Sequence, residues 1–179
     1  MAALVDTNVL VYRHDPRDPG KQARARALLR QGIEDGSLRV PHQAIVEFLA
    51  AVTRPVPGLG PLLSPADARR EAEEMLRTFT VLYPDAHLVR VALQGMAAYE
   101  LSWWDAHMWA YAEVHGLDTL YSEDYQHGRW YGGVQVVDPF ATRLLGAPEG
   151  AEGAEHAERW GWDWSDEEGE VRSVEDGTP

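Results

Sequence analysis

Short apolar runs alternate with stretches of helical periodicity along most of this 179-residue chain, and this alternation limits the possible folds more than any other feature. Five runs have the length and composition of strands, at residues 3–5, 38–40, 78–83, 119–122 and 134–137. Between them, apolar residues recur every three to four positions, which indicates amphipathic helices. Strands separated by helices favour a parallel sheet covered on both faces. The sequence therefore predicts a three-layer α/β domain with a central parallel sheet of four or five strands.

Prolines, glycines and capping residues delimit the expected helices. We expect helices over 19–31 with an end at Gly32, over 43–53, from Ser64 or Asp67 to about residue 77, over 86–99 and over 103–115. The segment from Pro55 to Pro65 holds four prolines and two glycines and is expected to be a loop.

The acidic residues are concentrated towards the C-terminal end. The whole chain has 29 acidic and 16 basic residues, for a net charge of −13. Residues 147–179 contain 11 of the acids and two of the bases, which leaves 18 acids and 14 bases in residues 1–146. Apart from Trp160, Trp162 and Trp164, this last segment has no apolar pattern. We therefore expect one globular domain over 1–146 and a disordered or loosely packed acidic tail over 147–179.

Several protein classes are excluded or weakened by what the sequence lacks. It has no cysteine, which excludes a disulfide framework and a Cys-based zinc site. No signal peptide or apolar stretch of about 18 residues is apparent, so we expect a cytoplasmic protein without a membrane span. The motifs GxxxxGK[ST] and GxSxG are absent, and Gly58-Leu59-Gly60 lies in the proline-rich segment. The sequence therefore gives little support for an ATPase, a hydrolase with a catalytic triad or a dinucleotide-binding protein.

Four acidic residues occupy positions that a parallel sheet would bring together. Asp6 directly follows the first strand, Asp124 follows the fourth, Asp105 lies near a helix start, and Glu47 is the single charge in residues 44–52. The carboxyl ends of parallel strands meet at one edge of the sheet. Clustered carboxylates repel one another unless they share a cation or protons. Oxygen ligands without cysteine or a His-x-x-x-His pair favour Mg²⁺ or Mn²⁺ over Zn²⁺.

Taken singly, most of these acids also have an ordinary structural explanation. Asp6 can cap the following helix, Asp105 completes a capping-box spacing with Ser102, and Asp124 suits a glycine-containing turn. Glu47 is harder to explain, because a lone charge among apolar neighbours requires a partner or a cleft. The hypothesis of a metal site therefore rests on the four residues together.

The segments that carry the four acids resemble, in order and spacing, the motifs of PIN-domain ribonucleases, and most closely those of VapC-type toxins of bacterial toxin–antitoxin pairs. The resemblance spans about residues 3–142, through segments 4–12, 40–48, 101–106 and 120–128. It departs from the family pattern in the proline-rich segment and in the tail.

This resemblance implies a function and a set of site residues. It implies an endoribonuclease that hydrolyses RNA phosphodiester bonds with one or two Mg²⁺ or Mn²⁺ ions, a small antitoxin that occludes the site, and a homodimer. The implied metal ligands are Asp6, Glu47, Asp105 and Asp124, with Asn8 and Ser122 as supporting polar residues. An RNA-processing nuclease without an antitoxin, and a catalytically silent PIN module that binds RNA or protein, stay open as alternatives.

Candidate RNA contacts lie outside these motifs. Basic residues near the first two helices can hold phosphates, although a solvated helix face explains the same pattern. Trp130 or Tyr131, in the glycine-rich stretch 128–133, can stack an unpaired base. The acids and tryptophans of the tail can also compete with RNA for the basic residues. The basic candidates are Arg13, Arg17, Lys21, Arg24 and Arg30.

Overall fold

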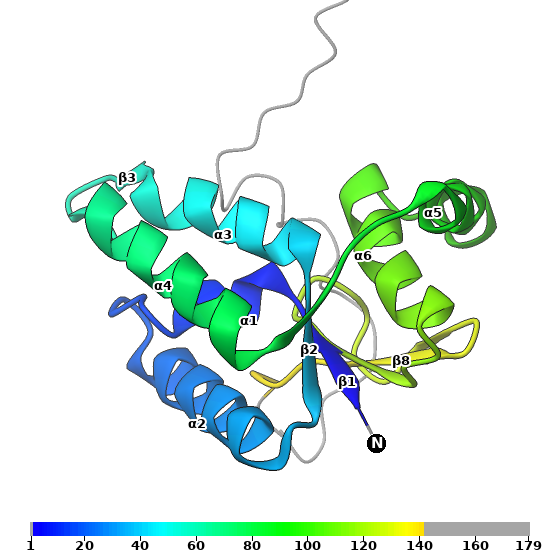
Figure 1. Cartoon of the computed structure of the whole chain (residues 1–179), viewed down its shortest axis with the longest axis horizontal. Coiled ribbons are helices and arrows are strands. Elements are labelled where there is room, and N and C mark those ends of the chain that lie inside the picture. Colours follow the sequence, from blue (N-terminus) through cyan, green and yellow to red (C-terminus); the bar gives the residue numbers. More distant parts are fainter. Residues whose placement is uncertain (1, 142–179) are drawn as a thin grey trace, which may run out of the picture.

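A central sheet with helices on both sides forms the domain (Figure 1). This computed structural model describes residues 2–141, and the expected tail over 147–179 lies outside them. The helices are α1 (Thr7–Tyr12), α2 (Pro19–Asp35), α3 (His42–Thr53), α4 (Pro65–Thr78), α5 (Ala86–Tyr99) and α6 (Trp103–Val114). In Figure 1, α1 to α4 lie on one side of the sheet and α5 and α6 on the other. None of the helices in the described range is long and apolar enough to cross a membrane.

The sheet has six strands in the order β5-β2-β1-β6-β8-β7. All neighbours pair in parallel except β7 and β8, which are antiparallel. The predicted α/β class is confirmed, with the five predicted strands in place and β7 added at the edge. The strands are β1 (Ala3–Val5), β2 (Leu38–Pro41), β5 (Thr80–Leu82), β6 (Thr119–Tyr121), β7 (Trp130–Tyr131) and β8 (Val134–Val137), and β3 (Pro55–Val56) and β4 (Gly60–Pro61) form a separate hairpin.

Strand β1 occupies the centre of the sheet, which explains why its residues are all apolar. Its three residues are buried, as expected for a parallel strand that is covered on both faces. Leu10 of α1, Phe48 of α3 and Tyr111 of α6 are also fully buried in the same core cluster. The core therefore lies on both faces of β1 and fixes the helices that follow the strand ends.

Two element boundaries differ from the sequence-based expectation. Helix α2 continues through Gly32 to Asp35, and the left-handed residue that ends it is Gly36, with φ 65°. Gly32 instead allows close packing, because a Cβ there would lie 2.2 Å from Leu38 Cδ1. The segment expected as a loop after Pro55 contains the hairpin β3–β4.

Candidate active site

The order of the strands creates a switch point between β1 and β6. From β1 the chain winds outwards to β2 and β5, and then returns to place β6 on the other side of β1. Asp6 follows β1, and its backbone N–H donates to the carbonyl of Tyr121 at the end of β6, at 3.0 Å. Asp124 comes three residues after Tyr121. Asp6 and Asp124 therefore flank the switch point at the carboxyl edge of the sheet, where open α/β folds bind ligands.

Asp6 is a buried carboxylate held at both oxygens. It is the N-cap of α1, and its Oδ1 accepts a hydrogen bond from the Thr7 backbone N–H at 2.5 Å. Its Oδ2 accepts from the Ser122 hydroxyl at 2.6 Å. Burial raises the pKa of Asp6 well above 3.8, and the charges of Asp124 and Glu47 raise it further. The ionised form is therefore costly unless a cation is present.

Asp124 is connected to Asp6 through Ser122 and Asn8. Asn8 Nδ2 donates to Asp124 Oδ2 at 2.9 Å and to Ser122 Oγ at 3.2 Å. The backbone N–H of Asp124 also donates to Ser122 Oγ, at 3.1 Å. Asn8 Oδ1 is buried and has no hydrogen-bond partner in the described part of the chain. Asn8 and Ser122 thus hold the two carboxylates in a fixed relation.

Glu47 enters the site from α3 and is held by two residues that sequence reasoning missed. Its Oε2 accepts from the Thr7 hydroxyl and its Oε1 from Gln43 Nε2, each at 2.7 Å. Burial raises the pKa of Glu47, and the charges of Asp105 and Asp124 add to this effect. The available sequence signals were the position of Thr7 beside Asp6 and that of Gln43 one helical turn before Glu47.

Gln43 is itself held by two contacts with α6. Its Nε2 also donates to the carbonyl of Trp104 at 3.1 Å. His107 Nδ1 lies 2.6 Å from Gln43 Oε1, which requires that this nitrogen carry the proton. Burial and the nearby His42 lower the pKa of His107. The amide that orients Glu47 is therefore fixed by a neutral imidazole.

Asp105 serves as a helix-capping residue and also contributes its charge to the site. Its backbone N–H donates to Ser102 Oγ at 3.2 Å, and Ser102 Oγ lies 2.7 Å from Asp105 Oδ2. Its charge raises the pKa of Glu47 and, after burial, that of Tyr125, whose hydroxyl donates to the Asp105 carbonyl at 2.7 Å. Asp105 can therefore cap α6 and still belong to the acidic cluster.

The donor set fits a hard divalent cation in chemistry and charge. The four carboxylates and the Asn8 amide supply oxygen ligands, and a cation would relieve the repulsion that raises the pKa values of Asp6 and Glu47. As they stand, however, no three acidic, histidine or cysteine side chains within residues 2–141 are grouped so that they could hold a metal ion. Glu47 and Asp105 are turned towards Thr7, Gln43 and Ser102. Chelation by all four carboxylates would therefore require these two side chains to rotate.

Most of the candidate RNA-binding cations contact other groups of the domain. Arg13 lies 3.4 Å from Glu71, and Arg17 Nη2 lies 2.6 Å from Asp15. Arg24 Nη1 donates to the carbonyl of Phe140 at 2.6 Å, and Lys21 pairs with Glu123. Arg30 is exposed on α2.

The aromatic candidate for base stacking lies on β7. Trp130 is 56% exposed and can contact a partner, whereas its neighbour Tyr131 is only 3% exposed. Trp130 therefore keeps its accessibility for a base, but Tyr131 is a core residue.

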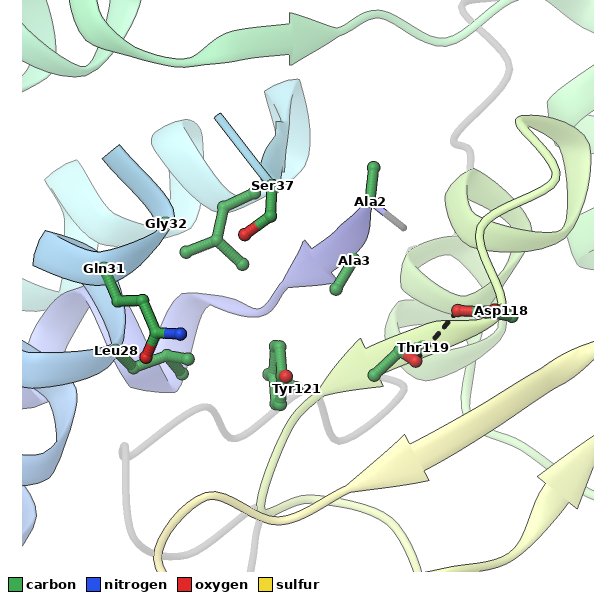
Figure 2. Close-up of a pocket in the computed structure, with 10 residues that line it drawn as sticks. Ala2, Ala3, Leu28, Gln31, Gly32, Ser37, Asp118, Thr119 and Tyr121 are labelled. Atoms are coloured by element: carbon green, nitrogen blue, oxygen red, sulfur yellow. Dashed lines mark hydrogen bonds between the residues drawn. The ribbon is translucent and has the colours of Figure 1, made fainter. Parts of the chain in front are cut away.

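A separate cavity of about 210 Å³ lies near the amino ends of the strands (Figure 2). Ala2 and Ala3 at the start of β1, Asp118 and Thr119 at the start of β6, and Gln31 of α2 are among the residues that line it. None of the four candidate carboxylates lines this cavity. It is therefore distinct from the acidic site at the carboxyl edge.

Comparisons with known proteins agree with the fold. The family model for the PIN domain matches residues 3–132, and the chain therefore belongs to the PIN-domain family. The predicted resemblance to that family is confirmed. Among curated protein sequences, none matches this chain.

Solved structures with the same fold include several toxins. The sarcin-ricin loop cleaving toxin VapC20 of Mycobacterium tuberculosis is 16% identical, with 69% of this chain and 90% of that chain covered and a TM-score of 0.54. A toxin–antitoxin complex from Klebsiella pneumoniae is 19% identical, with 77% of this chain and 98% of that chain covered and a TM-score of 0.55. The structure of FitAB bound to a DNA fragment is 20% identical, with 80% of this chain and 99% of that chain covered and a TM-score of 0.59.

Proposed function

We propose that this protein is a Mg²⁺- or Mn²⁺-dependent endoribonuclease, and that it is the toxin of a type II toxin–antitoxin pair. One observation carries the proposal. Carboxylates from separate elements of a PIN fold converge at its switch point, and the charges of Asp124 and Glu47 raise the pKa of the buried Asp6. Such an arrangement is costly in an empty site and is offset when a cation binds.

Asp6, Glu47, Asp105 and Asp124 would hold the cation or cations. A divalent cation bound there would polarise a phosphate oxygen and lower the pKa of a water molecule. Ser122 and Asn8 keep the oxygens of Asp6 and Asp124 oriented through the hydrogen bonds described above. Thr7 and Gln43 hold the Glu47 carboxylate through one hydrogen bond each.

The proposed partners are RNA, a small antitoxin that covers the site and a second copy of this chain, and the proposed location is the cytoplasm. The similarity in fold to a sarcin-ricin loop cleaving toxin supports an RNA substrate, and the similarity to a toxin–antitoxin complex supports the antitoxin. Trp130 is exposed and available for a base contact, whereas the cations of α2 are mostly engaged internally.

The test is to incubate the purified full-length protein with total RNA in Mg²⁺, in Mn²⁺ or in a chelator, and to map the cut ends. We expect cleavage at few sites with either metal and none with the chelator. Cleavage confined to one precursor RNA would instead favour a processing enzyme. RNA binding without cleavage in either metal would favour a silent module and contradict the proposal.

A further inference from the structure

The only lysine of the chain, Lys21, is partly buried in a contact that joins three parts of the fold. Its side chain is 19% exposed, and its Nζ donates to Glu123 Oε2 and, at 3.1 Å, to the Tyr12 hydroxyl. The ammonium group also lies 4.6 Å from the centre of the Tyr12 ring and 5.5 Å from that of Phe140. Lys21 belongs to α2 and Tyr12 to α1.

Glu123 lies between two residues of the acidic site. Its side chain is 9% exposed, and its Oε1 accepts from the Tyr12 hydroxyl at 2.6 Å. On one side of it, Ser122 holds Asp6, and on the other, Asp124 accepts from Asn8. The backbone on which Asp124 is carried is therefore tied to α1 and α2 through the Glu123 side chain.

A partly buried ion pair of this kind contributes little net stability, because desolvation of the two charges offsets much of their attraction. Its geometry is nevertheless specific, since removal of one partner leaves the other charge buried and unpaired. Lysine suits this place because its compact ammonium can contact a carboxylate, a hydroxyl and two ring faces together.

We propose that Lys21 and Tyr12 are positioning residues, which hold Asp124 in place through Glu123. For its effect on metal binding and cleavage, this inference rests on the proposed function. It is an alternative to the sequence-based prediction that Lys21 holds an RNA phosphate. The two roles differ in a measurable way, because a positioning residue changes the metal site and a phosphate contact changes the affinity for RNA.

The test compares Lys21→Met with Arg69→Met, which removes the same charge from an exposed position on α4. Amide hydrogen exchange at Ser122 and Asp124 is measured without metal, and Mn²⁺ affinity is measured by calorimetry. The kinetics of RNA cleavage give kcat and KM. For Lys21→Met we expect exchange at least tenfold faster at Asp124, Mn²⁺ affinity and kcat about tenfold lower, and KM within about twofold of wild type. Arg69→Met should match wild type in exchange, Mn²⁺ affinity, kcat and KM.

Glu123→Gln keeps the size of the side chain and serves if Lys21→Met does not fold. We expect it to change exchange and Mn²⁺ affinity in the same direction. Unchanged exchange and Mn²⁺ affinity in the folded variants would overturn the inference, and so would a raised KM with a weaker salt dependence. If the wild-type protein neither binds Mn²⁺ nor cuts RNA, the proposed function fails, whereas the exchange rates still decide whether Lys21 holds the segment.

Discussion

At Asp6, one carboxylate meets three requirements. It caps α1 at Thr7, accepts the Ser122 hydroxyl and carries a buried charge beside Asp124 and Glu47. An asparagine has only one acceptor oxygen, so it cannot satisfy both hydrogen bonds in the same way. Ser122 Oγ already accepts from Asn8 and from the Asp124 backbone. Asp6→Asn therefore changes more than charge, and Asp124 offers the cleaner test.

We expect Asp124→Asn to abolish metal-dependent cleavage and to raise the melting temperature in the absence of metal by about 2 °C or more, which corresponds to roughly 1 kcal/mol. The substitution removes a charge that raises the pKa of Asp6, and its amide oxygen can still accept from Asn8. Melts followed by circular dichroism test this, with Glu34→Gln on the exposed surface as the matched control. A lower melting temperature than that of the control would contradict charge crowding.

The pH dependence of metal binding follows from the raised pKa of Asp6. Because folded Asp6 holds its proton more tightly than the unfolded chain does, the contribution of Asp6 to metal-free stability is fully present below pH 3.8 and is lost as pH rises through the raised pKa. Protons and metal compete for the same carboxylate. We expect Mn²⁺ affinity to rise with pH by up to about tenfold per unit below that pKa. Calorimetric titrations from pH 5 to pH 8 measure this, and a flat profile would count against Asp6 as a ligand.

At the scale of elements, the sequence predicts those features that local patterns encode. Apolar runs locate β1 and β6, so the positions of Asp6 and Asp124 after strand ends could be predicted. The two-residue strand β7 and the hairpin β3–β4 could not, because strands this short are defined by their pairing. The hydrogen bond between Thr7 and Glu47 was harder to predict, since it joins α1 to α3 across 40 positions of the sequence.

Gly32 gives a test of packing between α2 and β2. A Cβ at this position would lie 2.2 Å from Leu38 Cδ1, and Leu38 is buried. We expect Gly32→Ala to lower the free energy of unfolding by about 1–3 kcal/mol despite the better helix propensity of alanine. Gly20→Ala, whose Cβ would meet only the Asp18 side chain at 3.2 Å, should be neutral or stabilising. Denaturant melts measure the free energy of unfolding of both variants. A Gly32→Ala protein more stable than the Gly20→Ala protein would contradict the prediction.

At the scale of the whole molecule, the acidic tail is a separate question, because it lies outside the described residues. The sequence-based hypothesis is that its acids and tryptophans compete with RNA. The internal contacts of Arg13, Arg17 and Arg24 leave fewer cations for such mimicry than the sequence alone indicated. The domain boundary near residue 146 likewise stays a prediction.

Truncation after Gly146 tests that hypothesis directly. If the tail inhibits the site from within the chain, we expect the truncated protein to cut RNA faster, because the tethered competitor acts at a millimolar effective concentration. Added salt should then narrow the difference by screening. Cleavage rates of the two forms are compared across a salt series, and identical rates would assign the tail to solubility or to a partner.

The central place of β6 has a consequence for the order of events during synthesis. Strand β6 comes late in the chain yet pairs with β1, which is made first, and Asp124 follows it. A nascent chain that ends before this strand has Asp6, Glu47 and Asp105 but lacks Asp124. The proposed metal site would therefore lack one of its four carboxylates until nearly the whole domain has emerged from the ribosome.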